Sequence, residues 1–246
     1  CRALRPHLLE YNRYRDITSL FVRQQVEIGG ESASAAGQRF DFKFGDYEFQ
    51  GLETNLLGTV QFNNAAIAVA LFLLWGQKRL LKRAPEEVES AIRAGLRDTR
   101  WPGRLEIIAQ HPLTVIDVGH TPDGIRQSLA SLKAIHGAGE WILVTGASGD
   151  KKADEIVGSL APSFDTIVCT AAYHKGAAPQ DIATTVRRAN PAAEVLVAAT
   201  IEDAVRVARE LAAARQRKLY VAGGLFLAIE YATAARGGRA RVFRFF

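Results

Sequence analysis

Short apolar runs alternate with helical stretches through the second half of the chain, and this alternation constrains the fold more than any other feature. Five runs of strand length occur, at residues 113–118, 141–145, 166–170, 195–198 and 219–222. Helical stretches follow them, at residues 123–136, 152–161, 179–188, 201–214 and 225–235. Strands that alternate with helices at this spacing run parallel and are joined by right-handed crossovers. The sequence therefore predicts a Rossmann-like, doubly wound and mostly parallel α/β sheet.

The first hundred residues follow a different pattern. Residues 17–60 show apolar–polar alternation, which predicts a small antiparallel hairpin set with turns at Gly29-Gly30 and Gly45-Asp46. Two helices are expected next, one over residues 65–74 and one that opens at Pro85 with acidic residues in its first turn. The helical pattern breaks at residues 101–104, so we expect two domains, 1–100 and 101–246.

Composition narrows the class of protein. The chain has 246 residues, 48% of them hydrophobic, which is typical of a globular protein and excludes disordered and collagen-like classes. Its 2 cysteines cannot form a disulfide framework or a zinc site, so we expect a reducing compartment, the cytoplasm. The longest apolar run, residues 64–75, is about a dozen residues long and too short to span a bilayer.

Two further features concern partners and completeness. The net charge of +5, the pI of about 9.4 and an arginine-rich end are the only support for a nucleic-acid-binding module. No RNA-binding aromatic motif accompanies them, so we expect no nucleic-acid partner. The sequence contains 0 methionines, so we interpret the chain as a fragment of a longer gene product.

Several common catalytic motifs are absent. The chain contains neither a G-x-x-x-x-G-K-[ST] phosphate loop nor a G-x-G-x-x-G fingerprint, although residues 146–151 resemble a phosphate loop superficially. It also has no G-x-S-x-G elbow and no His/Cys cluster with metal spacing, so no metal ligands are assigned here.

Asp117 and His120 form the most informative pair. Both fall at the end of an apolar run, just before a helix for which Thr121 is a suitable N-cap and Pro122 the first residue. A carboxylate and an imidazole at the carboxyl end of a strand suit a ribose hydroxyl and a phosphate oxygen. The alternative is that both side chains only satisfy backbone groups of the turn.

This segment carries a family resemblance. The run Trp101-Pro-Gly-Arg104-Leu-Glu, followed by a strand that ends in Asp117-Val-Gly-His120-Thr-Pro122, resembles the start of the C-terminal domain of the Mur ligase superfamily. The folylpolyglutamate synthase and dihydrofolate synthase branch is the closest match. Four more segments resemble motifs of that branch in the same order, at residues 57–66, 144–151, 174–177 and 220–227.

The resemblance implies an ATP-dependent amide ligase. ATP would phosphorylate the carboxylate of folate or dihydropteroate, and the amine of L-glutamate would attack the acyl phosphate. It places Asn64 at the adenine, Asp117 at the ribose and Arg104 at the phosphates. His120 would lie beside the phosphates and the acyl intermediate, and Lys151 near the incoming amino acid or the phosphates. Asn64 could also be a helix N-cap, and Arg104 a surface residue after a turn.

The same resemblance implies that other parts of the active site belong to a segment outside this chain. The phosphate loop and the Mg²⁺ ligands of the family belong upstream of Cys1, so residues 1–100 would be the rest of a central ATP-binding domain. We therefore expect apolar surface on that part and no activity of the isolated chain. The family is usually monomeric. Four residues depart from the family motifs: Val60, Thr121, Lys152 and Gly224.

Two alternatives stay open. Another Mur branch, such as a muramyl peptide ligase or a cyanophycin synthetase-like enzyme, is less favoured because a D-N-P-R signature is absent. The four departures favour a second alternative, a non-catalytic nucleotide-binding or interaction module that kept the fold.

Overall fold

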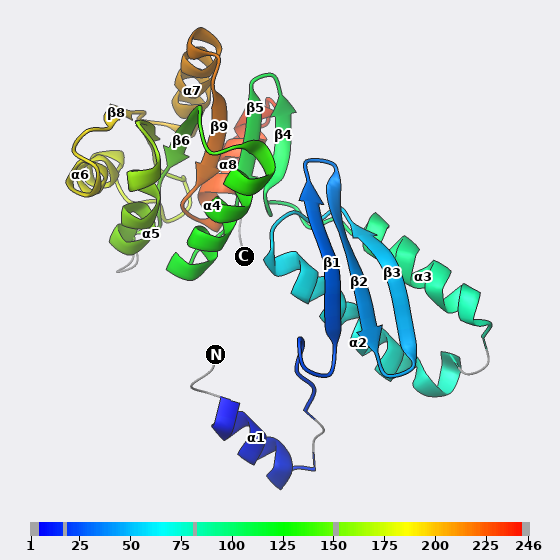
Figure 1. Cartoon of the computed structure of the whole chain (residues 1–246). Helices are drawn as coiled ribbons and strands as arrows, with labels where there is room; N and C mark the ends of the chain where they lie inside the picture. The colour runs from blue at the N-terminus through cyan, green and yellow to red at the C-terminus, as the bar shows by residue number, and fades with distance from the viewer. Residues whose placement is uncertain (1–4, 17–18, 81–82, 150–152, 243–246) are drawn as a thin grey trace. The chain divides into compact units, whose positions relative to one another are not determined.

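A computed structural model of the chain describes residues 5–16, 19–80, 83–149 and 153–242 (Figure 1). The chain divides into two compact units, which are described separately below. One comprises residues 1–55 and 60–99, and the other residues 56–59 and 100–246. Within the described residues, no helix has the length and apolar character that crossing a membrane requires.

The smaller unit is a three-stranded antiparallel sheet covered on one face by helices. Its strands are β1 (Glu27–Ser34), β2 (Gly37–Phe44) and β3 (Tyr47–Thr54), and they pair in that order. Helices α2 (Val60–Leu80) and α3 (Pro85–Asp98) cover the sheet, and α1 (Arg5–Tyr14) precedes it. Aromatic side chains of the sheet and apolar side chains of α2 and α3 form one core, which includes Phe40, Phe42, Leu52, Phe62 and Ile92.

One of the two predicted turns is confirmed and the other is wrong. Phe44 pairs with Tyr47, so Gly45-Asp46 forms the β2–β3 turn as expected. Strand β1 continues through Gly29-Gly30, where the pairing register shifts. Gly30 has φ +56°, and a Cβ there would lie 2.4 Å from Oδ2 of Asp41. The glycine pair therefore accommodates a bulge in the strand, and the chain reverses at residues 35–36 instead.

Helix α2 presents apolar side chains to solvent as well as to the core. Ile67, Leu71, Leu74 and Trp75 are exposed by 43%, 59%, 40% and 70%. Their spacing of three and four residues places them along one side of the helix. The smaller unit thus has an apolar helix face outside its own core.

The larger unit is a six-stranded sheet between two layers of helices, and it confirms the predicted fold class. The strand order is β4-β5-β9-β6-β7-β8, and only the pair β4–β5 is antiparallel. The strands are β4 (Glu106–Gln110), β5 (Leu113–Asp117), β6 (Trp141–Thr145), β7 (Thr166–Cys169), β8 (Glu194–Val197) and β9 (Lys218–Ala222). The sequence reasoning missed β4 and α1.

Helices cover both faces of this sheet, which explains why its strands are almost continuously apolar. One face packs against α4 (Pro122–His136), α5 (Ala153–Leu160) and α6 (Pro179–Ala189). The other face packs against α7 (Ile201–Arg215) and α8 (Leu225–Ala235). Alternate residues of β9 enter the two cores, because Tyr220 belongs to the first and Val221 to the second. The loops after the parallel strands therefore gather at one edge of the sheet.

Candidate functional site

Asp117 ends β5 and is only 1% exposed. Its carboxylate accepts hydrogen bonds from the backbone N–H of Leu105, at 3.2 Å, and of Gly119, at 2.8 Å. The Ser128 side chain of α4 is a third partner. The backbone N–H of Val118 also donates to the Gly103 carbonyl, at 2.8 Å. Asp117 thus ties the turn before β4 to the turn after β5.

Opposing effects act on the Asp117 carboxyl. Burial raises its pKa above the usual value. Hydrogen bonds from Gly119, Ser128 and Leu105 lower the pKa, and so does the positive charge of Arg104, but burial dominates. The guanidinium of Arg104 is therefore close enough to Asp117 to act on its charge.

Arg104 and His120 flank this buried carboxylate in the sequence. Arg104 lies between Gly103, with φ +80°, and Leu105, with φ +44°. A Cβ at residue 103 would come within 2.4 Å of a Val118 methyl group, so only glycine allows the two turns to approach this closely. His120 follows Gly119 and is exposed, with its Nδ1 3.3 Å from the Val118 carbonyl oxygen. The structure therefore brings Arg104, Asp117 and His120 to one end of β5.

The start of α4 adds to the charge of this site. Thr121 is the N-cap, as predicted, and its hydroxyl accepts from the backbone N–H of Gly124 at 3.2 Å. Pro122 is the first helical residue. The partial positive charge of a helix N-terminus favours an anion. Together with His120 and Arg104, it makes this edge of the sheet suited to an anion.

Neighbouring strands contribute closely packed glycine turns to the same edge. A Cβ at Gly146, after β6, would lie 2.3 Å from the Thr170 carbonyl oxygen. A Cβ at Gly223, after β9, would lie 2.0 Å from the Gly146 carbonyl oxygen. Both positions therefore require glycine. The β7–α6 loop carries His174 and Lys175, and Lys151 and Lys152 lie outside the described residues.

Asn64 lies in the smaller unit, within α2. The helix begins at Val60, so the alternative that Asn64 is a helix N-cap is wrong. Its side chain is exposed, and Nδ2 donates to Oε1 of Gln61 at 2.9 Å. The amide is thus on the helix surface, where it is accessible to a ligand.

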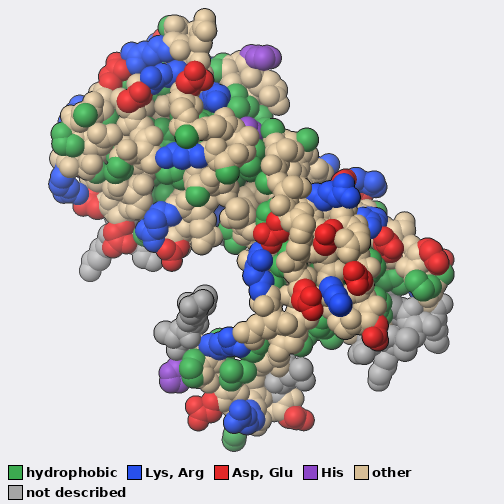
Figure 2. Space-filling model, viewed as in Figure 1, with side chains coloured by type: hydrophobic (Ala, Val, Ile, Leu, Met, Phe, Trp, Pro, Cys, Tyr) green, Lys and Arg blue, Asp and Glu red, His purple; other side chains and the backbone are tan. Residues whose placement is uncertain are grey.

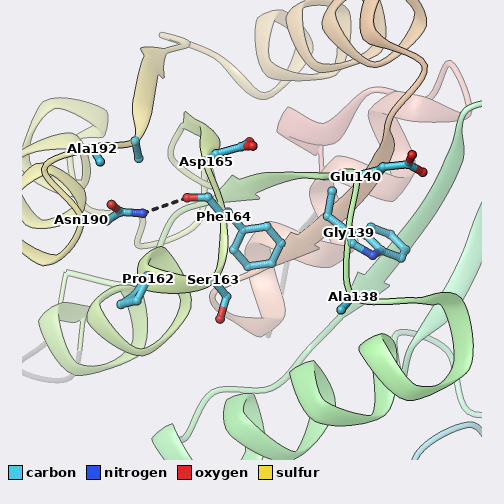
Figure 3. A pocket seen from close by; sticks show the side chains of 11 residues that line it. Ala138, Gly139, Glu140, Pro162, Ser163, Phe164, Asp165, Asn190 and Ala192 are labelled. Carbon is cyan, nitrogen blue, oxygen red and sulfur yellow. Dashed lines mark hydrogen bonds between the residues drawn. The ribbon is translucent and has the colours of Figure 1, made fainter.

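A surface hollow lies at the opposite edge of the sheet (Figure 3). Its lining includes Trp141, the first residue of β6, and Asp165, which directly precedes β7. Asn190 also lines the hollow, and its side-chain amide donates a hydrogen bond to the Phe164 carbonyl at 2.9 Å. Ligands of open α/β sheets bind at the carboxyl ends of strands, so this hollow is not the expected site.

Charge and metal-ligating groups are dispersed over the described residues. Figure 2 shows basic side chains interspersed with acidic ones on the drawn face. No group of three or more His, Cys, Asp or Glu side chains suited to a metal ion occurs among the residues that the structure describes.

Sequence reasoning missed two participants of this edge. Ser128 lies two turns into α4 and reaches Asp117 only because the helix packs beside β5. Glu230 is 1% exposed and hydrogen-bonds the backbone of residues 173 and 174. A single acidic residue in the otherwise apolar stretch Leu225–Ala235 was the signal that could have identified it.

Comparison with known proteins places this geometry in a family. Residues 103–224 match the family model described as the Mur ligase, glutamate ligase domain. This segment, which contains the Arg104–Asp117–His120 turn, belongs to the Mur ligase family. The chain is 34% identical over 162 residues to a protein of Haloferax volcanii named a probable bifunctional folylpolyglutamate synthase/dihydropteroate synthase, covering 65% of this chain and 18% of the relative.

Two further similarities extend the comparison. A UDP-N-acetylmuramyl-tripeptide synthetase of Leifsonia xyli subsp. xyli is 30% identical over 184 residues, covering 70% of this chain and 35% of the relative. The structure resembles Mycobacterium tuberculosis folylpolyglutamate synthase complexed with ADP, with a TM-score of 0.79 and 24% identity over 94% of this chain and 51% of that chain. The chain thus spans about half the length of the solved protein and less of the curated relatives.

Proposed function

We propose that this chain is part of an ATP-dependent ligase that joins glutamate to the carboxylate of a folate or of dihydropteroate. The observation that carries the proposal is the turn at the end of β5. There the buried carboxylate of Asp117 fixes the backbone next to Arg104 and His120, beside a helix N-terminus, within a segment of the Mur ligase family. Relatives named for folylpolyglutamate synthesis support the substrate class.

The proposed chemistry follows from the charges of the reaction. A carboxylate is a poor electrophile, so transfer of a phosphoryl group from ATP gives it a leaving group. Charge builds on the transferring phosphoryl group, and fixed positive groups stabilise it. We assign Arg104 to the phosphates and His120 to the phosphates and the acyl phosphate. ATP brings Mg²⁺ to such a site, and we expect its protein ligands outside this chain.

The nucleoside part of ATP has two proposed contacts. The exposed amide of Asn64 offers a donor and an acceptor, which suits the edge of an adenine ring. Asp117 is assigned to the ribose hydroxyls through the lone pair that Leu105, Gly119 and Ser128 leave free on its carboxylate. Lys151 is proposed to lie near the amino acid or the phosphates.

The wider organisation is part of the same proposal. Residues 1–100 would be the end of the central ATP-binding domain, and residues 101–246 the C-terminal domain. We propose a monomeric, cytoplasmic enzyme whose partners are small molecules, with no membrane or nucleic-acid partner. The isolated chain is expected to release phosphate from ATP only at the background rate, because misplacing reacting groups by about 1 Å is costly.

Two alternatives remain as outcomes of a test. The similarity to a muramyl-tripeptide synthetase supports another Mur branch, and the departures at Val60, Thr121, Lys152 and Gly224 support a non-catalytic nucleotide-binding module. The substrate that elicits amide formation, when the chain is assayed within its full gene product, separates these outcomes.

The arginine assignment has a matched control within the chain. Arg126 lies on α4, is exposed and pairs with Asp123. Binding of an ATP analogue should weaken about 10-fold or more in Arg104→Ala and stay unchanged in Arg126→Ala, because a hydrogen bond to a charged group contributes about 1.5–3 kcal/mol. Equal binding by both variants would contradict the proposed phosphate site.

A further inference from the structure

Glu230 is one of only two acidic side chains that are buried among the residues the structure describes; the other is Asp117. It lies in the second turn of α8, with apolar neighbours such as Leu227 and Tyr231, and is 1% exposed. Burial of a carboxylate is costly unless hydrogen bonds compensate for the lost water. The partners of Glu230 therefore indicate what this side chain is for.

Both partners are backbone N–H groups of the β7–α6 loop. Oε2 accepts from the backbone N–H of Tyr173 at 2.6 Å, and Oε1 accepts from that of His174 at 3.0 Å. No ion pair joins Glu230 to a lysine or arginine in the described parts of the chain. Two adjacent N–H groups that point at one anion form a concave backbone site, which the side chain of α8 fills here.

Only a carboxylate satisfies this arrangement. Each of its oxygens accepts one of the two N–H groups, whereas a glutamine amide has one oxygen and would turn its NH₂ group towards the second donor. An unsatisfied buried donor costs more than a hydrogen bond gains. Glu230 thus fixes the backbone at residues 173 and 174 in a way that its neutral isostere cannot.

The loop held by Glu230 is also fixed on its other side. The Gly149 N–H donates to the Lys175 carbonyl at 3.0 Å, and the Ala177 N–H donates to the Ala147 carbonyl at 2.9 Å. Lys175 has φ +56°, a left-handed conformation that non-glycine residues adopt only when their surroundings impose it. Glu230 and the β6–α5 loop together impose the path of this loop.

This path decides where two nitrogen-bearing side chains lie. The His174 ring packs against the Phe226 ring of α8, with 4.3 Å between the ring centroids. Lys175 is exposed at the same edge of the sheet as the turn of Arg104 and His120. The amino acid that the proposed ligase adds carries carboxylates, and an exposed lysine on a fixed loop attracts such a ligand.

We infer that Glu230 is a positioning residue that sets the β7–α6 loop, so that His174 and Lys175 receive a carboxylate of the incoming amino acid. The inference rests on the proposed function for its ligand and on the hydrogen bonds of Glu230 for its mechanism. Glu230 itself touches no substrate. It acts through the backbone of the two residues that precede Lys175.

The test compares four forms of the chain: wild type, Glu230→Gln, Glu230→Asp and Tyr231→Phe. Tyr231 is the matched control, since it is the next residue of α8 and its buried hydroxyl has no hydrogen-bond partner among the described residues. Amide hydrogen exchange at residues 173 and 174 reports the loop. Titrations with L-glutamate and with an ATP analogue, followed by amide chemical shifts, report the two ligands.

In Glu230→Gln we expect about tenfold faster exchange at residues 173 and 174, the effect of losing about 1.4 kcal/mol. L-Glutamate should bind about tenfold more weakly, while the ATP analogue binds as before. Glu230→Asp keeps both carboxylate oxygens on a shorter side chain. Exchange at residues 173 and 174 should therefore be slower than in Glu230→Gln but faster than in wild type. Tyr231→Phe should match wild type in all three measurements.

Two results would overturn the inference. Unchanged exchange at residues 173 and 174 in Glu230→Gln would show that the carboxylate does not hold the loop. An equal loss of L-glutamate and nucleotide affinity would show general destabilisation instead of positioning. If the loop is released in Glu230→Gln but wild type binds neither ligand, both alone and within its full gene product, the proposed function fails and the ligand part of the inference fails with it.

Discussion

Two buried carboxylates at the same edge of the sheet, Asp117 and Glu230, perform comparable structural tasks in different ways. Asp117 acts locally and ties together the two turns on either side of the β4–β5 hairpin. Glu230 acts at long range, because it hydrogen-bonds residues that precede it by 57 and 56 positions. Each is paired with backbone N–H groups, and burial raises the pKa of each. A buried acid can therefore build a site without being the group that does its chemistry.

Asp117→Asn should have the largest effect that distinguishes the two carboxylates. The amide cannot accept from both Leu105 and Gly119, so the free energy of unfolding should fall by about 1–3 kcal/mol. Loss of charge at the proposed ribose contact should also weaken nucleotide binding by about 10- to 150-fold. Thermal unfolding and nucleotide titration of the same samples measure both changes.

The exposed residue Asp123 on α4 provides the control for that experiment. Its side chain pairs with Arg126 at the surface, so Asp123→Asn should change stability and nucleotide affinity little. If Asp117→Asn lowers stability but leaves nucleotide affinity intact, then Asp117 only satisfies the turn and the ribose assignment is wrong.

His120→Ala tests the histidine that follows Asp117 in the same turn, in the full ligase that would contain this chain. His120 is exposed, so the substitution should barely alter the melting temperature. Its proposed place is beside the phosphoryl group, where charge changes during the reaction. Steady-state kinetics should therefore show a larger fall in kcat than rise in KM for ATP. A melting temperature lowered as much as in Asp117→Asn, with normal kinetics, would favour the structural alternative.

The pH dependence of the free energy of unfolding should differ between a buried carboxylate and a surface carboxylate in an ion pair. This difference is expected to be smaller than the effects of Asp117→Asn and His120→Ala. Burial raises the pKa of Glu230 above its usual value of 4.5, so the folded state binds this proton more tightly than the unfolded state. The contribution of Glu230 to stability is then largest below that value and declines as the pH rises through the raised pKa. The free energy of unfolding of wild type should therefore fall as the pH rises through the raised pKa, and Glu230→Gln should lack this part of the pH dependence, as measured by urea unfolding.

Asp165 should show the opposite sign. Its ion pair with Arg217 lowers its pKa below the usual value of 3.8, so its contribution is present above that pH and is lost as the pH falls further. Asp165→Asn should therefore cost more stability at neutral pH than at strongly acidic pH. The same trend in both variants would mean that the buried environment of Glu230 is not what sets its titration.

The fold shows which features can be predicted from the sequence and which cannot. Strand–helix alternation predicted the parallel strands and the helices that cover them, because both faces of the sheet are buried and the apolar runs are uninterrupted. Strand β4 was missed because its pairing is antiparallel, at the edge of the sheet, and its residues are only partly buried. Gly29-Gly30 was misassigned, since a bulge and a turn require the same residue type.

The residues of the candidate site also differ in how well the sequence predicts them. Asp117 was found because Arg104, Asp117 and His120 lie within one short segment of sequence, and their proximity follows from a single strand. Glu230 was missed because its partners depend on how α8 packs against the β7–α6 loop, a contact that no local pattern encodes. Long-range hydrogen bonds to backbone groups leave no motif, only an isolated acid in an apolar helix.

The most direct test of the central claim maps ligand contacts onto the backbone amides of the larger unit. An ATP analogue should shift the amide resonances of residues 103–105 and 118–120, and L-glutamate those of residues 173–176. This result would assign the nucleotide to the turn that Asp117 holds and the amino acid to the loop that Glu230 holds. Nucleotide-induced shifts confined to residues 173–176, or absent from both turns of the Asp117 site, would contradict the account.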